Sequence, residues 1–188
     1  MPSLVSYALV SILFTISYFF SLLAMLLPNW LVFSTRPSRP FHTSVYYGLF
    51  KKCTRYNDTC RPFPSSDQND CAERNFCEEW EAAAIGMILA AVVGGLAWLH
   101  LISVLLGGRA MRDRAWKILS VLFFVYALLQ FLSIAFIAHL YSTADTFYYG
   151  TKYDVSFILA NVSASFSVML GITLFMNGLL SPPEYTRI

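Results

Sequence analysis

Apolar and polar positions divide the chain into four long apolar stretches joined by polar segments. The apolar stretches cover residues 4–27, 82–106, 118–141 and 155–180. Each exceeds the roughly 20 residues that an α-helix needs to cross the hydrocarbon core of a bilayer. We therefore expect the 188 residues to form a single domain with four membrane-spanning helices, the first of them retained rather than cleaved as a signal peptide.

The longest polar segment, residues 28–81, lies between the first two apolar stretches. Residues 31–33 and 43–50 are rich in β-branched and aromatic side chains, and the proline-containing residues 37–40 separate them. This composition predicts a small antiparallel sheet. Trp30 directly follows the first apolar stretch, where we expect an aromatic anchor at the membrane interface.

All four cysteines of the chain, Cys53, Cys60, Cys71 and Cys77, fall within this polar segment. An even number of cysteines in one polar loop favours disulfides and an oxidising compartment. We favour pairing of nearest neighbours, because each pair closes a short loop, although two other connectivities remain open. A zinc site is the alternative, but the spacings within the two pairs are wider than those typical of zinc ligands.

Charge indicates the orientation of the chain. Residues 107–117 carry Arg109, Arg112, Arg114 and Lys117 against Asp113, as is typical of a cytoplasmic loop. We therefore expect residues 28–81 and 142–154 outside the cell, with both termini and the tail, residues 181–188, in the cytoplasm. Asn57 begins a glycosylation sequon in the first outer loop and should be modified, whereas the sequon at Asn161 lies inside a span.

Small residues follow one face of the second span at Ala82, Gly86, Ala90 and Gly94. Such a row lets another helix approach closely, either inside the bundle, which we favour, or in a dimer. The second outer loop is aromatic, at Phe147, Tyr148, Tyr149 and Tyr153. These rings indicate either interfacial anchoring or a second contact surface.

Composition restricts the classes of function. The chain is 57% hydrophobic and 13% charged, with a net charge of +2, so we expect membrane lipid around it and no nucleic-acid partner. His100 and His139 lie in spans that carry no acid, which favours helix packing over a proton relay. The sequence carries no nucleophile elbow, metalloprotease motif or phosphate-binding loop, so we expect no enzyme, no cofactor and no metal.

The first outer loop carries a recognisable combination of residues: Trp30, then Gly48-Leu49-Phe50, then Cys53 and Cys60. With the four spans, it resembles the claudin and peripheral myelin protein superfamily, whose loop signature is Trp, Gly-Leu-Trp and two cysteines. Phe50 stands where that family usually has tryptophan, and Cys71 and Cys77 are additional. Residues 153–160 are similar to the peripheral myelin branch.

The resemblance implies a membrane all-α four-helix bundle with a small extracellular antiparallel β-sheet and a disulfide between Cys53 and Cys60. It also implies a non-enzymatic protein of the plasma membrane, acting through protein contacts in cell adhesion, in junctions or in membrane-domain organisation. The alternative is an auxiliary subunit of a channel, receptor or transporter. A paracellular or transmembrane pore is less favoured, because the bases and acids of the first loop nearly balance.

The expected partners are a lateral homo-oligomer or a larger membrane protein. The C-terminus, with Thr186 two places before the terminal Ile188, also fits capture by a cytoplasmic PDZ protein. Many claudins end in a comparable ligand, so the resemblance favours this interpretation.

Overall fold

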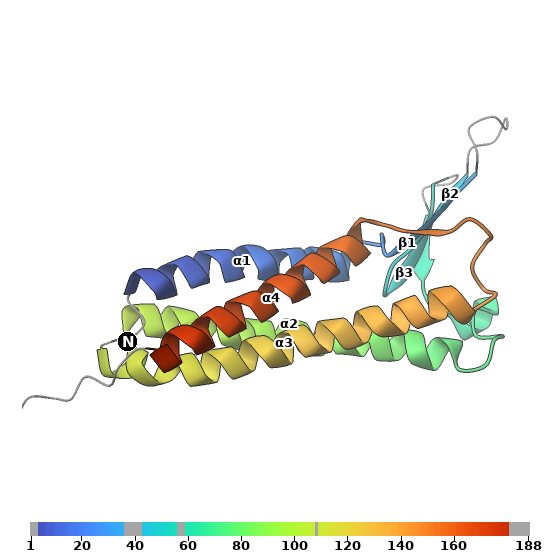
Figure 1. Ribbon diagram of the computed structural model, residues 1–188. Coiled ribbons are helices and arrows are strands. Elements are labelled where there is room, and N and C mark those ends of the chain that lie inside the picture. The colour runs from blue at the N-terminus through green and yellow to red at the C-terminus, as the bar shows by residue number, and fades with distance from the viewer. Residues whose placement is uncertain (1–3, 36–42, 56–58, 108, 181–188) are drawn as a thin grey trace, which may run out of the picture.

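The computed structural model describes residues 4–35, 43–55, 59–107 and 109–180, with the backbone alone at 109–114. These residues form four long helices: α1 (Leu4–Leu26), α2 (Phe76–Leu106), α3 (Arg109–Thr143) and α4 (Val155–Leu180). The helices pack into a bundle in which α1 contacts α2 and α4, and α3 contacts the same two helices (Figure 1). All four are long and apolar enough to cross a membrane, which indicates a multi-pass membrane protein.

Helices α2 and α3 extend beyond the apolar stretches of the sequence. Helix α2 begins at Phe76, and in Figure 1 its first turns and the last turns of α3 project past the end of α1. Glu78 and Glu79 lie in the first turn of α2, where negative charge interacts favourably with the helix dipole. Most of residues 107–117, which we expected as a loop between two spans, is helical, because α3 begins at Arg109; the cytoplasmic position of this segment stays a prediction. A helix does not have to end where its apolar face ends.

A five-stranded antiparallel sheet stands at one end of the bundle, opposite the start of α1 and the end of α4 (Figure 1). Its strands, in spatial order β4-β3-β2-β1-β5, are β4 (Thr59–Pro62), β3 (Lys51–Thr54), β2 (Ser44–Tyr47), β1 (Leu31–Ser34) and β5 (Lys152–Tyr153). The small antiparallel sheet is confirmed, but β5 comes from the segment between α3 and α4. That strand pairs with β1 through Leu31 opposite Tyr153 and Val32 opposite Lys152.

The row of small residues on α2 packs inside the bundle. A Cβ atom on Gly94 would lie 2.7 Å from the ring of Tyr18 and 2.8 Å from the ring of Tyr126. A Cβ atom on Gly86 would collide with the hydroxyl of Ser133 on α3. Since neighbouring helices occupy this face, it serves the internal packing favoured above.

Hydroxyl and amide groups link three helices in the bundle interior. Ser17 on α1 and Ser163 on α4 each donate a hydrogen bond to the other's backbone carbonyl, at 3.1 and 2.9 Å. Gln130 on α3 donates to Ser21 at 3.1 Å, and the hydroxyl of Tyr126 lies 3.1 Å from that of Ser163. Such bonds hold helices together in an apolar surrounding, where the hydrophobic effect contributes little.

Candidate functional site

The sheet and the projecting ends of α2 and α3 form one unit, which we call the sheet end. Its core is aromatic: Trp80 lies 5.0 Å from Phe63, 5.8 Å from Phe76 and 6.0 Å from Phe147, measured between ring centroids. Tyr47 of β2 packs on the same group, 5.3 Å from Phe147. Because Phe63 follows β4, Trp80 belongs to α2 and Phe147 follows α3, this cluster fixes the sheet on the helices.

Trp30 belongs to this core and is not an interfacial anchor. Its side chain is fully buried, and its Nε1 donates a 2.7 Å hydrogen bond to the carbonyl of Ala24 in α1. Its backbone N–H donates to the carbonyl of Tyr47, and its own carbonyl accepts from the N–H of Asp154. Trp30 therefore ties the end of α1 to the sheet and to the start of α4.

The Gly48-Leu49-Phe50 triplet forms the turn between β2 and β3. A Cβ atom on Gly48 would lie 2.5 Å from the backbone Cα of Pro28, so only glycine fits where the chain leaves α1. Leu49 is buried, and its carbonyl accepts a 3.1 Å hydrogen bond from Nε1 of Trp80. Phe50 is 43% exposed, so the first two residues are architectural and the third faces outward.

The cysteines form the nearest-neighbour disulfides that the sequence favoured. Cys53 and Cys60 lie directly opposite each other on β3 and β4, with Cα atoms 4.1 Å apart. Cys71 and Cys77 are bonded across the start of α2, with Cα atoms 5.4 Å apart. The first bond ties the edge strand β4 to the sheet, and the second fixes the loop that leads into α2.

One face of the sheet carries charges that are compensated. Arg61 of β4 donates two hydrogen bonds, of 2.5 and 2.7 Å, to the carboxylate of buried Asp70. Burial alone would raise the pKa of Asp70, but the hydrogen bonds and charge of Arg61 hold it below its ordinary value. Lys52 lies 4.7 Å from the ring centroid of Tyr47, and burial lowers its pKa. Burial likewise raises the pKa of the Tyr47 hydroxyl.

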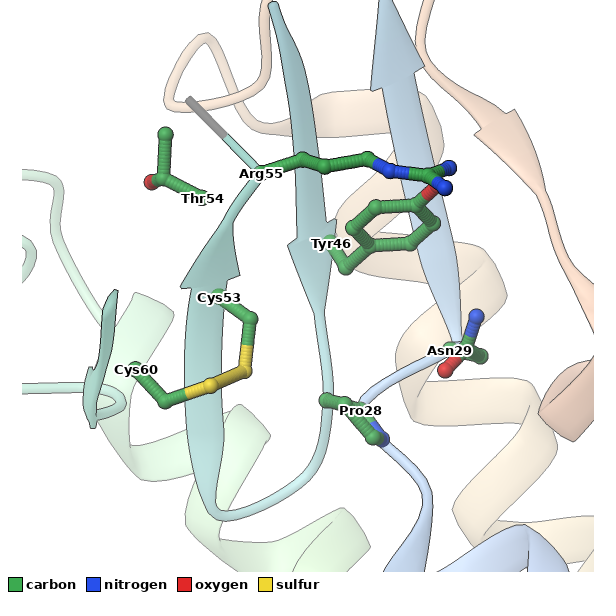
Figure 2. Close-up of a pocket in the computed structure, with 7 residues that line it drawn as sticks. All are labelled: Pro28, Asn29, Tyr46, Cys53, Thr54, Arg55 and Cys60. Carbon is green, nitrogen blue, oxygen red and sulfur yellow. A yellow bond between two sulfur atoms is a disulfide. The ribbon is translucent and has the colours of Figure 1, made fainter. Parts of the chain in front are cut away.

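The opposite face of the sheet borders a groove of about 300 Å³ next to the end of α1. Figure 2 shows the residues that line it: Pro28, Asn29, Tyr46, Cys53, Thr54, Arg55 and Cys60. The disulfide forms one side of the groove, and Pro28 and Asn29 form the other (Figure 2). The side chain of Arg55 extends across β2 and ends beside the ring of Tyr46 (Figure 2).

The aromatic segment between α3 and α4 divides into anchored and free side chains. Phe147 enters the aromatic core, and Tyr153 stacks on Phe157 at a centroid distance of 4.1 Å. Tyr149 is fully exposed at 104% relative accessibility. Tyr148 is 54% exposed, and its ring lies 4.9 Å from that of Phe33. The segment therefore presents two tyrosines outward from a fixed base.

Hydrogen bonds hold this segment on both sides. The Glu73 carboxylate accepts from the Thr146 hydroxyl at 2.9 Å and from the Asp145 N–H at 3.3 Å. The Tyr141 hydroxyl donates to the carbonyl of Thr151, and both the N–H and the hydroxyl of Thr151 donate to the carbonyl of Tyr148. These hydrogen bonds hold both ends of the turn that carries the two tyrosines.

His139 has a partner that the sequence did not indicate. Its Nδ1 lies 2.9 Å from the carboxylate of Glu79, where α2 and α3 project together past the end of α1. The apolar stretches of the sequence contain no acid, whereas Glu79 belongs to the polar first turn of α2. The pair joins the two helices that carry the sheet.

Three of the predicted site residues, Asn57, Thr186 and Ile188, lie outside the described residues. The second sequon lies within α4, where the Asn161 amide donates to the carbonyl of Phe157 and Ser163 is buried. Among the described residues, no three His, Cys, Asp or Glu side chains gather so that they could hold a metal ion. The chain matches no protein-family model, and no curated protein sequence matches it.

Proposed function

We propose that the chain is a claudin-like membrane protein that acts by contact, with the sheet end outside the cell. The observation that carries this proposal is the pair of exposed tyrosines, Tyr148 and Tyr149, on a rigid base. An exposed aromatic side chain on a backbone that is already held in place loses little conformational entropy when a partner covers it. Tyrosine is also among the residues that contribute most to binding at protein interfaces.

The construction of the sheet end supports the same proposal. Two disulfides, a core of large aromatic rings and the ion pair of Arg61 with Asp70 all stiffen a surface that is far from the centre of the bundle. The hydrogen bonds of Trp30 also fix the sheet relative to α1 and α4. Such a platform suits the organisation of membrane contacts or domains. We infer no catalytic role for it.

A cell-contact assay tests this proposal. Two cell populations express the full chain with different fluorescent tags, and the enrichment of both tags at shared contacts is measured. Tyr149→Ser should reduce enrichment strongly, since the loss of an aromatic hot-spot side chain typically weakens binding by about 30-fold. Tyr149→Phe is the matched control and should keep it. Equal enrichment with Tyr149→Ser and the unaltered chain would contradict a contact role for this loop.

A second function, as auxiliary subunit of a larger membrane protein, is favoured by a groove on the side of the bundle. The groove measures about 220 Å³ between α1 and α4, and is lined by Leu13, Ile16, Ser17, Phe20, Val162 and Phe166. An apolar groove of this size could receive side chains from a partner's transmembrane helix. Copurification in mild detergent separates the two functions: a large partner in fixed ratio supports the auxiliary role, and homo-oligomers support the organiser.

The remaining assignments belong to the same proposal. We place the protein in the plasma membrane, with both termini in the cytoplasm, and we propose glycosylation at Asn57. The C-terminal Thr186 and Ile188 remain a candidate ligand for a PDZ domain. Pull-down with a peptide of residues 181–188, compared with the same peptide carrying alanine at both positions, tests this; equal recovery of PDZ proteins would exclude a specific ligand.

A further inference from the structure

The sheet face that borders the groove carries three cations. The strand register places Lys152, Val32, Tyr46, Cys53 and Cys60 side by side in one row across the five strands. Because side chains two residues apart on a strand share a face, Lys51 and Arg55 flank Cys53 on this same side. The side chains of Lys51, Arg55 and Lys152 are all exposed.

These cations differ from those on the other face of the same strands. Arg61 is paired with Asp70, and Lys52 lies over the rings of Tyr47 and Phe63. Among the described residues, no carboxylate forms an ion pair with Lys51, Arg55 or Lys152. The cations on the face that packs on the helices have partners within the protein, whereas those on the groove face can bind anions from outside the protein.

The groove lies where a membrane-spanning helix leaves the hydrocarbon. Pro28 and Asn29 form its wall just beyond the end of α1. Leu26, the last residue of α1, and Leu27, which follows it, are exposed. In Figure 1 the sheet stands beyond the end of α1 and slants away from α2 and α3. With Leu26 and Leu27 among the acyl chains, the groove lies at the depth of the headgroups, a layer of roughly 5 to 8 Å on each side of the hydrocarbon core.

We propose that this groove binds the phosphate-bearing headgroup of an anionic phospholipid, taken from the leaflet in which α1 ends. The Arg55 guanidinium, which has donors suited to phosphate oxygens, lies at the groove, while Lys51 and Lys152 add positive charge along the same face. The carboxylate of Asp154 accepts a 2.9 Å hydrogen bond from the Asn29 amide at the edge of the groove, so the anion is held on the Arg55 side. Lipid binding here requires the helices to cross a bilayer but is independent of the contact function.

Native mass spectrometry of the full-length protein in nonionic detergent tests this assignment. Phosphatidylglycerol or phosphatidylcholine is titrated, and the protein with bound lipid is quantified. We expect preferential binding of phosphatidylglycerol, weakened by about fivefold in Arg55→Gln, the loss typical of one cation at an anionic surface. Removal of Lys51 and Lys152 in addition to Arg55 should weaken phosphatidylglycerol binding by about 100-fold in total. Rising salt should weaken the preference in the unaltered chain.

Two variants control for general effects of charge and folding. Arg74→Gln removes the same charge from an exposed position in the loop closed by Cys71 and Cys77, and it should bind phosphatidylglycerol normally. Arg55→Lys keeps the charge and should retain most of the binding. Arg55→Gln should keep the thermal unfolding midpoint of the unaltered chain, because its side chain is exposed.

Three results would overturn the assignment. One is equal binding of the two lipids, and another is equal loss of binding in Arg55→Gln and Arg74→Gln. The third is displacement of phosphatidylglycerol by an equal concentration of glycerol 3-phosphate, which would assign the groove to a soluble phosphate instead of a lipid. A soluble acidic polymer, polyglutamate, is tested in parallel; if it binds through Arg55 while the lipids show no preference, the face recognises an acidic protein instead.

Discussion

Replacement of Trp80 tests how the sheet is held on the bundle. The side chain is fully buried, and its Nε1 donates to the carbonyl of Leu49 in the turn between β2 and β3. Trp80→Phe keeps most of the apolar contact with Phe63 and Phe76 but leaves a buried carbonyl without its donor, at a cost of about 1 to 3 kcal/mol. Trp80→Ala also opens a cavity, and large-to-small changes of an aromatic core residue cost about 3 to 5 kcal/mol.

These free energies should be measurable as local opening of the sheet. Hydrogen–deuterium exchange of the full-length protein in lipid nanodiscs reports on the backbone N–H groups of β2 and β3. The sheet peptides should exchange about 5 to 150 times faster in Trp80→Phe, since each 1.4 kcal/mol is a factor of ten. In Trp80→Ala the acceleration should exceed roughly 100-fold.

Trp98→Phe is the matched control, because Nε1 of Trp98 donates to Thr15 between α2 and α1, away from the sheet. It should leave exchange of the sheet peptides unchanged. Unaltered exchange of the β2–β3 peptides in Trp80→Phe, or faster exchange confined to α2 in Trp80→Ala, would refute the role of Trp80 as the link between sheet and helix.

Three further predictions follow from the packing and charge of the molecule. Asp70→Asn should destabilise the sheet end by about 2 kcal/mol at neutral pH. Folding lowers the pKa of Asp70 below its ordinary 3.8, so the extra stability of the unaltered chain persists above pH 3.8 and disappears as the pH falls through the folded-state pKa. Acid unfolding of both chains measures this difference. Cys53→Ser should cost about 2 to 5 kcal/mol and leave Cys60 unpaired, so surface biotinylation should find the chain retained inside the cell; normal surface delivery would argue against this. Gly94→Ala should lower the thermal unfolding midpoint in detergent, since overpacking costs about 1 to 3 kcal/mol. Gly95→Ala should leave the midpoint unchanged, because a Cβ atom there would meet only the Tyr18 hydroxyl, at 3.3 Å. Equal midpoints of the two variants would contradict the tight packing at Gly94.

The helices could be predicted from the sequence because lipid imposes a simple requirement on composition. Residues 155–180 and α4 have the same bounds, and α1 ends one residue before the predicted limit. Hydropathy does not show where a helix extends beyond its apolar stretch, as α2 does at Phe76, because it reports the surroundings of a helix and not its hydrogen bonding. The contact of His139 with Glu79 was missed for the same reason.

The sheet could be predicted only in part. Strands β1 and β2 are aromatic and β-branched, as the composition of residues 31–33 and 43–50 indicated. Strands β3 and β4, with the sequences KKCT and TCRP, have no such signal. Strand β3 is fixed by pairing with β2, and β4 is fixed by pairing with β3 and by the Cys53–Cys60 disulfide. Strand β5 has two residues and exists only because β1, more than a hundred residues earlier in the chain, offers it an edge.

The candidate site depended on tertiary contacts that one sequence does not reveal. Trp30 follows an apolar stretch and so resembles an interfacial residue, but its burial depends on the carbonyl of Ala24 and on the return of the chain at Asp154. Likewise, the seven bases of residues 28–81 are balanced by seven acids in the sequence. Only the strand register separates the paired Arg61 from the unpaired cations on the groove face.

Lysine labelling of intact cells tests the proposed topology most directly. The lysines of the chain are Lys51, Lys52, Lys117 and Lys152, and the described side chains of Lys51, Lys117 and Lys152 are exposed. Lys51 and Lys152 lie on the sheet, whereas Lys117 lies near the start of α3 at the other end of the bundle. A membrane-impermeant amine reagent, followed by peptide mass spectrometry, should modify Lys51 and Lys152 in intact cells and Lys117 only after permeabilisation. Labelling of Lys117 alone in intact cells would show that the orientation is the reverse of the proposed one. Labelling of only one of Lys51 and Lys152 would contradict the four-span arrangement itself.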